Sequence, residues 1–259
     1  MEHFPIITIA TVTYNAESTL QRTLDSVAKQ TYQHIEHLII DGCSKDLTTE
    51  IIHHYVNENA GQAVPHDIRF IREPDNGLYD AMNKALTHAS GDYIVFLNAG
   101  DTLHSPHTIE QMFSSITSPY PAIVYGETDI VDENGAFLRH RRLQAPEQLH
   151  WKHLRWGMLV CHQSFYVRTD LAKQELYNLR YRYSADFDWC IRLLKQAHNK
   201  KEGIHNSNMI LTDYLSEGMT TKHQKVSLWE RFRIMVTHYG FFSTLLLHFW
   251  FIARLFTKK

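Results

Sequence analysis

The sequence has few cysteines and little net charge, and both features exclude classes of protein. Its three cysteines, Cys43, Cys161 and Cys190, stand far apart and form no C-x-x-C pair. Neither a disulfide framework nor a cysteine zinc site is therefore indicated, and a reducing compartment is expected. The formal net charge is −2 over 259 residues, which gives no general surface for nucleic acid. The amino terminus lacks the basic flank and apolar core of a signal peptide.

Several motifs of nucleotide and metal enzymes are also missing. No G-x-G-x-x-G follows the first apolar run, and no G-x-x-x-x-G-K-[ST] occurs anywhere. These absences argue against a dinucleotide dehydrogenase and a P-loop enzyme. The chain has 18 histidines but no H-E-x-x-H, and we interpret His34 and His37 as surface residues rather than metal ligands.

The first hundred residues alternate between apolar runs and amphipathic segments. Strands are predicted at 6–12, 35–40, 68–73 and 93–97, and helices at 15–30, 45–58 and directly after Gly77. This alternation predicts an α/β fold whose mostly parallel sheet is covered by helices on both faces. Further along, the pattern predicts two strands joined by a turn at 132–135, a strand at 163–168 and a helix at 186–197.

Polar residues follow all four predicted strands. They are Thr13-Tyr14-Asn15, Asp41, Asp75-Asn76-Gly77, and Asn98 with Gly100 and Asp101. Turn and cap preferences explain any one of these positions. Open parallel sheets, however, bind ligands outside the carboxyl ends of their strands, so four such ends together predict a binding cleft. The oxygens of Asn98 and Asp101 suit a hard cation such as Mg²⁺ or Mn²⁺.

Four segments carry a resemblance to a known family. In order and spacing they are similar to the motifs of family 2 glycosyltransferases with the GT-A fold: "TVTYNAESTLQRTLDSVAKQTYQHIEHLIIDGCSKD", "EPDNGLYDAMNKAL", "ASGDYIVFLNAGD" and "SADFDWCIRLLK". The likeness spans roughly residues 4–220. The sequence most resembles the bacterial enzymes that build capsule, exopolysaccharide, lipopolysaccharide or colanic-acid chains.

This resemblance implies a Rossmann-like GT-A fold and an inverting transfer. A sugar would pass from a nucleoside-diphosphate-sugar to a hydroxyl of a glycan or polyprenyl-linked acceptor during synthesis of cell-surface polysaccharide. Asp186 matches the position of the family's general base. The family's metal motif, D-x-D, reads Asn98-Ala99-Gly100-Asp101 here. Asp101 is therefore expected to contact Mg²⁺ or Mn²⁺, at a site that Asn98 weakens because it is neutral.

The resemblance and the strand ends together give the other expected site residues. The expected donor-nucleotide contacts are Thr11, Tyr14, Asn15, Asp41, Ser44, Asp75, Asn76, Gly77, Asp80, Asn83 and Asn98. The expected acceptor contacts are His162, Gln163 and Asp188. The alternative role for Asp188 is to orient the base, Asp186. His223 is a further candidate for a diphosphate or metal contact, with an ordinary surface histidine as the alternative.

The segment 228–259 is expected to be a helical tail that follows a catalytic domain of residues 1–227. Its run 241–256 is rich in Phe, Leu and Trp, but it is shorter than the about 20 apolar residues that span a bilayer. A basic end, Lys258-Lys259, follows. These features predict an interfacial helix on a cytoplasmic protein, at the cytoplasmic face of the inner membrane. Packing on the domain or in a homodimer interface is the alternative.

Two other functions remain open from the sequence. One is a non-catalytic GT-A-like protein that binds sugar nucleotides or acts as a scaffold, and Asn98 in the metal motif is its best support. The other is a sugar-1-phosphate nucleotidyltransferase. Such enzymes usually have a glycine-rich basic loop after the first strand, which "TYNAESTL" lacks.

Overall fold

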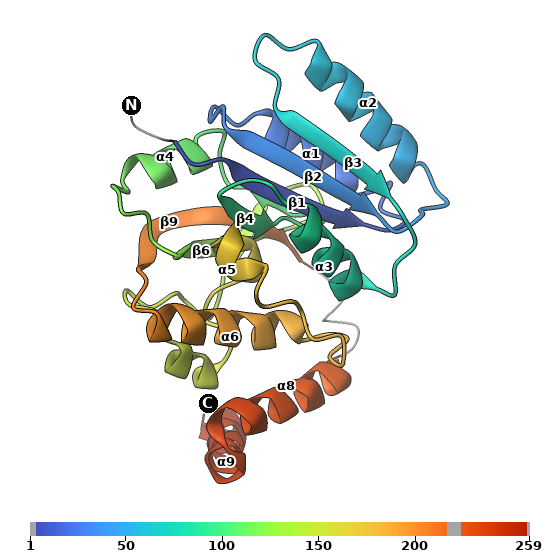
Figure 1. Ribbon diagram of the computed structural model, residues 1–259. Coiled ribbons are helices and arrows are strands. Elements are labelled where there is room, and N and C mark those ends of the chain that lie inside the picture. The colour runs from blue at the N-terminus through green and yellow to red at the C-terminus, as the bar shows by residue number, and fades with distance from the viewer. Residues whose placement is uncertain (1–3, 217–223, 258–259) are drawn as a thin grey trace.

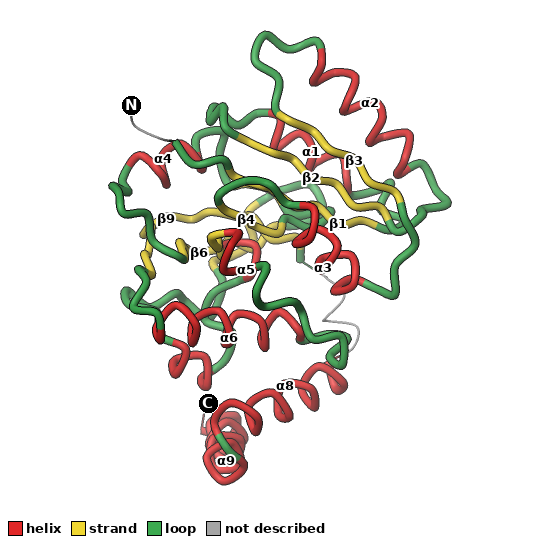
Figure 2. Tube along the Cα trace, viewed as in Figure 1, coloured by secondary structure: helices red, strands yellow, loops and turns green. Residues whose placement is uncertain are grey.

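The computed structural model describes residues 4–216 and 224–257. This part of the chain folds around one mixed sheet of nine strands in the order β3-β2-β1-β4-β8-β6-β9-β5, with β7 paired to β6. Helices lie on both sides of the sheet (Figures 1 and 2). The predicted α/β class is therefore confirmed.

The first half of the sheet is parallel, as predicted. Its strands are β1 (Ile7–Thr13), β2 (Ile35–Asp41), β3 (Asp67–Arg72) and β4 (Tyr93–Phe96), and its helices are α1 (Leu20–Ala28), α2 (Thr48–Ala60) and α3 (Leu78–His88). Thr13 pairs with Asp41, and Asp41 pairs with Arg72. Three strands therefore end at one level, and the polar residues after them meet at one edge of the sheet.

Side chains on these strands alternate between the two faces of the sheet. Ala10 and Val12 of β1 pack with Met82 of α3 and with α6, whereas Ile39 of β2 packs with Leu24 of α1 and with α2. This alternation is the period of two that a strand covered on both faces requires.

A buried carboxylate ties the parallel strands together. Glu36 on β2 accepts hydrogen bonds from Thr8 of β1, from Ser90 before β4, and from Arg69 of β3 at 2.8 Å. Burial alone would raise the pKa of Glu36, but the hydrogen bonds from Ser90, Thr8 and Arg69 outweigh it and lower the pKa to about 2. Glu36 is therefore ionised in the folded protein at neutral pH and stabilises this half of the sheet.

The second half is mixed. Its elements are β5 (Thr102–Leu103), α4 (Thr108–Ser114), β6 (Ile123–Val131), β7 (Phe137–His140), the 3₁₀ helices η1 (Trp151–Trp156) and η2 (His162–Ser164), β8 (Phe165–Arg168), α5 (Thr169–Ala172), α6 (Ala185–Asn199) and β9 (Ile204–Leu215). The predicted hairpin at 132–135 and the helix at 186–197 are confirmed. Strand β9, parallel to β6, has no counterpart among the predicted strands.

Two helices form the tail, α8 (Gln224–Tyr239) and α9 (Phe241–Thr257). They lie beyond α6, far from α2 (Figure 1). Glu230 on α8 accepts hydrogen bonds from the backbone amides of Arg182 and Tyr183 at 2.8 and 2.9 Å. Ile234 and Met235 are buried in the main core. The expected boundary at residue 228 therefore falls inside a helix that is packed on the domain.

The interpretation of His37 as a surface residue is wrong. His37 lies on β2, fully buried, and its ring nitrogens contact the hydroxyls of Thr11 at 3.0 Å and Tyr55 at 2.8 Å. Burial lowers the pKa of His37 to about 3, so the ring is a neutral part of the core.

Candidate active site

The ends of β1 and β2 are joined by a compact set of hydrogen bonds. The Asp41 carboxylate accepts from the Ser44 hydroxyl and from the Ser44 amide at 2.9 Å. The Ser44 hydroxyl also accepts from the Asn15 amide at 2.9 Å, and Asn15 Oδ1 accepts from the amide of Lys45 at 2.9 Å. Arg72, at the end of β3, lies 3.4 Å from Asp41. The structure therefore brings Asn15, Asp41 and Ser44 together, as expected, with Asp41 fully buried beneath the loop.

The turn into α3 lies beside this loop. Gly77 has φ +114 at the start of the helix, a conformation that glycine adopts without steric cost. Asp75 accepts from the Gly77 amide at 2.8 Å, and Asp80 accepts from the Asn76 amide at 2.9 Å. A Cβ on Gly42 would lie 2.3 Å from an Asp75 oxygen, so the bare backbone after β2 lets the Asp75 carboxylate approach.

Tyr14 completes this edge, because its ring also lies beside Gly42 and its side chain is exposed. The side chains of Tyr14 and Asp75 thus face outward at this edge of the sheet, whereas Asp41 and Ser44 hold the loop in place.

Two expected donor contacts lie elsewhere. Thr11 is fully buried, and its hydroxyl contacts the ring of His37, so its side chain points into the core rather than to the edge. Asn83 uses both ends of its amide on the backbone of Tyr177, at 3.0 and 2.7 Å. Asn83 therefore holds the loop before α6, and its contact with the donor stays a prediction.

Asp186 lies at the start of α6 with its carboxylate held from two sides. The Tyr79 hydroxyl donates to Asp186 Oδ1 at 2.9 Å, and His162 Nδ1 lies 3.5 Å from Asp186 Oδ2. His162 Nε2 in turn lies 3.3 Å from the Asn98 amide nitrogen. A neutral imidazole protonated on Nδ1 fits both contacts, since it donates to Asp186 and accepts from Asn98. The network joins the end of β4 to α3 and α6.

This environment keeps Asp186 ionised. Burial alone would raise its pKa, but the contacts with His162 and the hydrogen bond from Tyr79 lower it below the usual range for aspartate. The side chain remains 16% exposed, so a hydroxyl could reach it.

The residues expected to hold a metal ion do not fit one well. Asp101 is 4% exposed, and its two oxygens accept from Gln163 Nε2 at 2.8 Å and from the Leu215 amide at 3.0 Å. Burial raises the pKa of Asp101 to about 6. Asn98 Oδ1 is buried and has no partner among the described residues, but it is neutral. A single engaged carboxylate and one amide oxygen are a poor ligand set for a hard cation.

Gln163 and Asp188 are also engaged within the protein. Gln163 is buried and donates to Asp101. Asp188 accepts from Arg192 Nε at 2.8 Å and contacts His238 Nε2 at 2.7 Å, so it links α6 to α8. Both side chains thus have partners within the protein, and their contact with an acceptor stays a prediction. His162 alone of the three expected acceptor residues contacts Asp186, and His223 lies outside the described residues.

Sequence reasoning missed Tyr79. The residue stands two positions after Gly77 in "GLYDAM", where it looks like one more apolar residue of α3. Its ring is buried and stacks on Tyr177 at 5.4 Å between ring centroids, and its function becomes apparent only because α6 brings Asp186 to its hydroxyl.

The chain is similar to known glycosyltransferases. Residues 8–175 match the family described as glycosyl transferase family 2. A "PGL/p-HBAD biosynthesis glycosyltransferase" of Mycobacterium bovis (strain BCG / Pasteur 1173P2) is 32% identical over 194 residues, which cover 73% of this chain and 69% of that protein. An "uncharacterized glycosyltransferase" of Mycobacterium tuberculosis (strain ATCC 25618 / H37Rv) is 32% identical over 197 residues, which cover 74% of this chain and 70% of that one.

Solved structures show the same fold. Staphylococcus aureus TarS 1–349 in complex with UDP matches 90% of this chain with a TM-score of 0.66 at 16% identity, and 64% of that chain is covered. Mannosyltransferase PcManGT from Pyrobaculum calidifontis, in complex with GDP-Man and Mn²⁺, matches 91% of this chain with a TM-score of 0.60 at 15% identity, and 63% of that chain is covered. This chain thus spans less than two thirds of each structure. The GT-A fold is confirmed, and the chain belongs to glycosyl transferase family 2 and is a glycosyltransferase.

Proposed function

We propose that this glycosyltransferase inverts the anomeric carbon and that Asp186 is its general base. The observation that carries the proposal is the Asp186 carboxylate, which is ionised, held by Tyr79 and His162, and still partly exposed. A base needs this combination, because it must keep its orientation while a substrate hydroxyl approaches.

The proposed reaction is a single displacement. Asp186 takes the proton of the acceptor hydroxyl while that oxygen bonds to the anomeric carbon. The bond from this carbon to the diphosphate oxygen breaks, and the diphosphate leaves with the electron pair. Attack and departure occur on opposite faces of the sugar, so the configuration inverts and no glycosyl–enzyme bond forms. A positioned base typically contributes about 10²–10⁴ in rate.

We propose that the donor is a nucleoside-diphosphate-sugar lying over the ends of β1, β2 and β3. The outward groups there, Tyr14 and Asp75, offer a ring and a carboxylate, which suit stacking on a base and hydrogen bonds from a nucleoside. Asn76, Gly77 and Asp80, at the turn into α3, are further proposed donor contacts, as is Asn98. The similar structures hold UDP and GDP-Man, which supports the nucleotide class.

We propose a glycan or polyprenyl-linked acceptor in cell-surface polysaccharide synthesis, reached at the cytoplasmic face of a membrane. No helix in the described ranges 4–216 and 224–257 is long and apolar enough to cross a membrane. The tail nevertheless exposes large apolar side chains: Phe242 is 79% exposed, Leu246 70% and Phe249 63%. The segment 224–259 carries six Lys and Arg residues against Glu230 alone. Exposed aromatic residues beside cationic ones suit an anionic lipid surface.

A donor panel with product analysis tests the proposed function. The full chain is incubated with UDP- and GDP-sugars and a polyprenyl-linked acceptor, in chelator and in Mn²⁺, and the anomeric configuration of the product is read by NMR. We expect transfer from one donor with inverted configuration. A product with retained configuration would reject Asp186 as a base for single displacement.

A further inference from the structure

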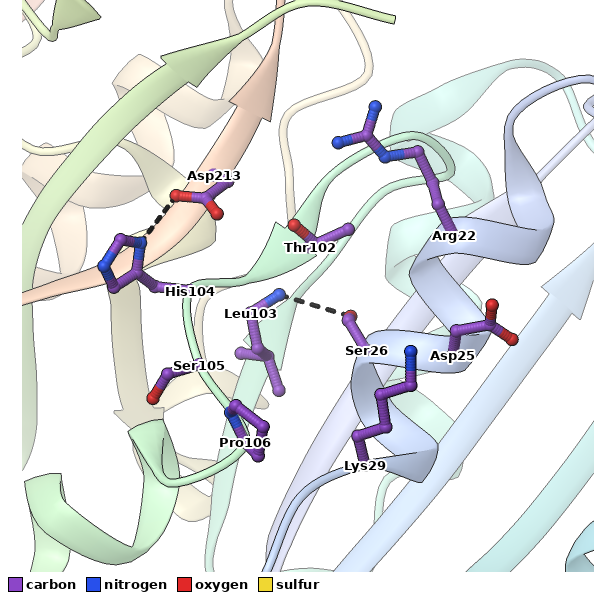
Figure 3. A pocket seen from close by; sticks show the side chains of 10 residues that line it. All are labelled: Arg22, Asp25, Ser26, Lys29, Thr102, Leu103, His104, Ser105, Pro106 and Asp213. Atoms are coloured by element: carbon purple, nitrogen blue, oxygen red, sulfur yellow. Dashed lines mark hydrogen bonds and ion pairs between the residues drawn. The ribbon is translucent and has the colours of Figure 1, made fainter. Parts of the chain in front are cut away.

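A second cluster of charged side chains lies outside the site described above. His104 follows β5, Asp129 lies on β6 and Asp213 lies on β9, and these three residues bring ligand atoms within 4.8 Å of one another. His104 Nδ1 lies 2.7 Å from Asp213 Oδ1, as Figure 3 shows beside the hollow that Arg22 and Lys29 also line. We propose that this cluster is a binding site for a divalent transition-metal ion.

The cluster faces away from Asp186. On the paired strands β6 and β9, Asp129 is level with Asp213, and Thr128 is level with Thr212. Thr128 contacts Ser164, and Thr212 donates to the Gln163 carbonyl, so the two threonines face η2. Successive residues of a strand point to opposite faces, so the two aspartates point to the other side. The cluster and the catalytic network thus lie on different faces of the sheet.

Two carboxylates at level positions of paired strands repel each other. Asp129 is also nearly buried, which increases the cost of its charge. Each carboxylate contacts a histidine ring nitrogen. His104 Nδ1 contacts Asp213, and His140 Nδ1 lies 2.8 Å from Asp129 Oδ1. A divalent cation between the two carboxylates would balance their charges.

The ligand types select the class of ion. One imidazole nitrogen with two carboxylates suits Zn²⁺ or Mn²⁺, whereas Mg²⁺ prefers oxygen ligands and water. His140 would act through Asp129, since a partner that orients a ligand typically changes metal affinity about 10–100-fold. Two of the three proposed ligands, His104 and Asp213, line the hollow.

Such an ion would stabilise the strands behind Asp101. Asp213 stands two residues before Leu215, whose amide donates to Asp101, and His104 stands three residues after Asp101. An ion bound by His104, Asp129 and Asp213 would join β5, β6 and β9 at this point. Because an ion that binds only the folded state raises its stability, binding should increase the melting temperature.

Calorimetric titration of the chelator-treated full chain with ZnCl₂, MnCl₂ and MgCl₂ tests the proposal, with thermal melts in parallel. We expect one Zn²⁺ or Mn²⁺ per chain, a higher melting temperature with the ion, and Mg²⁺ bound at least tenfold more weakly. Asp213→Asn should abolish binding, and His140→Ala should weaken it about 10–100-fold.

Two control variants separate this site from others. Asp25→Asn removes a carboxylate that lines the same hollow but is not a proposed ligand, and Asp101→Asn removes the carboxylate of the expected donor-metal site. Both should retain the ion. The absence of Zn²⁺ and Mn²⁺ binding by the folded chain would overturn the proposal, as would unchanged binding in a folded Asp213→Asn variant, or loss of binding in Asp101→Asn alone.

Discussion

The hydrogen bond from Tyr79 to Asp186 gives a prediction for the acid side of the pH–rate profile. Tyr79→Phe removes one donor to a charged acceptor, and such a bond is worth about 1.5–3 kcal/mol. Loss of this bond should raise the pKa of Asp186. The pKa rises, rather than falls, because the hydrogen bond from Tyr79 favours the ionised form of Asp186. The acidic limb of kcat/KM should therefore move to higher pH.

The assay is kcat/KM for transfer between about pH 3 and 8, since this parameter reports ionisation in the free enzyme and the pKa of Asp186 lies below the usual range for aspartate. Tyr177→Phe is the matched control, because Tyr177 stacks on Tyr79 but its hydroxyl has no partner in the described part of the chain. The control should keep the wild-type limb. An unmoved limb in Tyr79→Phe, or an equal shift in both variants, would refute Asp186 as the group that titrates.

Three further predictions concern stability, the donor and the tail. Glu36→Gln should lower the free energy of unfolding by about 3 kcal/mol at pH 7, measured by urea denaturation. Because the pKa of Glu36 is lowered, this difference should disappear as the pH falls from 4.5 toward 2. Asp41→Ala should weaken UDP or GDP binding by about 1–3 kcal/mol in calorimetry. Phe242→Glu with Leu246→Glu should abolish flotation with anionic liposomes, whereas the exposed control Phe137→Glu should float normally.

Each of these predictions has a contrary outcome. If Glu36→Gln is as stable as the wild type at pH 7, the buried network makes no net contribution to the free energy of unfolding. Unchanged nucleotide affinity in Asp41→Ala would move the donor away from the end of β2. Persistent flotation of the tail variant would contradict a lipid-binding tail. Loss of a dimer in the same variant, measured by light scattering, would favour the homodimer interface instead.

The parallel half of the fold was predictable because local pattern and tertiary position agree there. The run 6–12 consists of apolar and β-branched residues and overlaps β1, which is buried on both faces. Strand β9 was missed because its sequence, "IHNSNMILTDYL", mixes polar and apolar residues without strict alternation. Its place in the sheet depends on pairing with β6, a contact between residues that are distant in sequence.

The site was predictable where position along a strand determines it. Asp41, Ser44 and Asn15 meet because neighbouring parallel strands end together. Asn83 and Asp188 match the family's motifs, yet the structure uses both on internal partners, because a motif gives a residue's place but not the direction of its side chain. Tyr79 could not be assigned, since its partner Asp186 lies 107 residues away.

The central claim is that the Asp186 carboxylate accepts the proton of the acceptor hydroxyl, and Asp186→Asn tests it most directly. This variant keeps the size of the side chain and removes the charge that accepts the proton. Single-turnover transfer should slow by at least about 10²-fold, while calorimetry should find donor affinity unchanged, because the donor is proposed to lie over β1, β2 and β3. Near-normal transfer by a folded Asp186→Asn variant would contradict the claim.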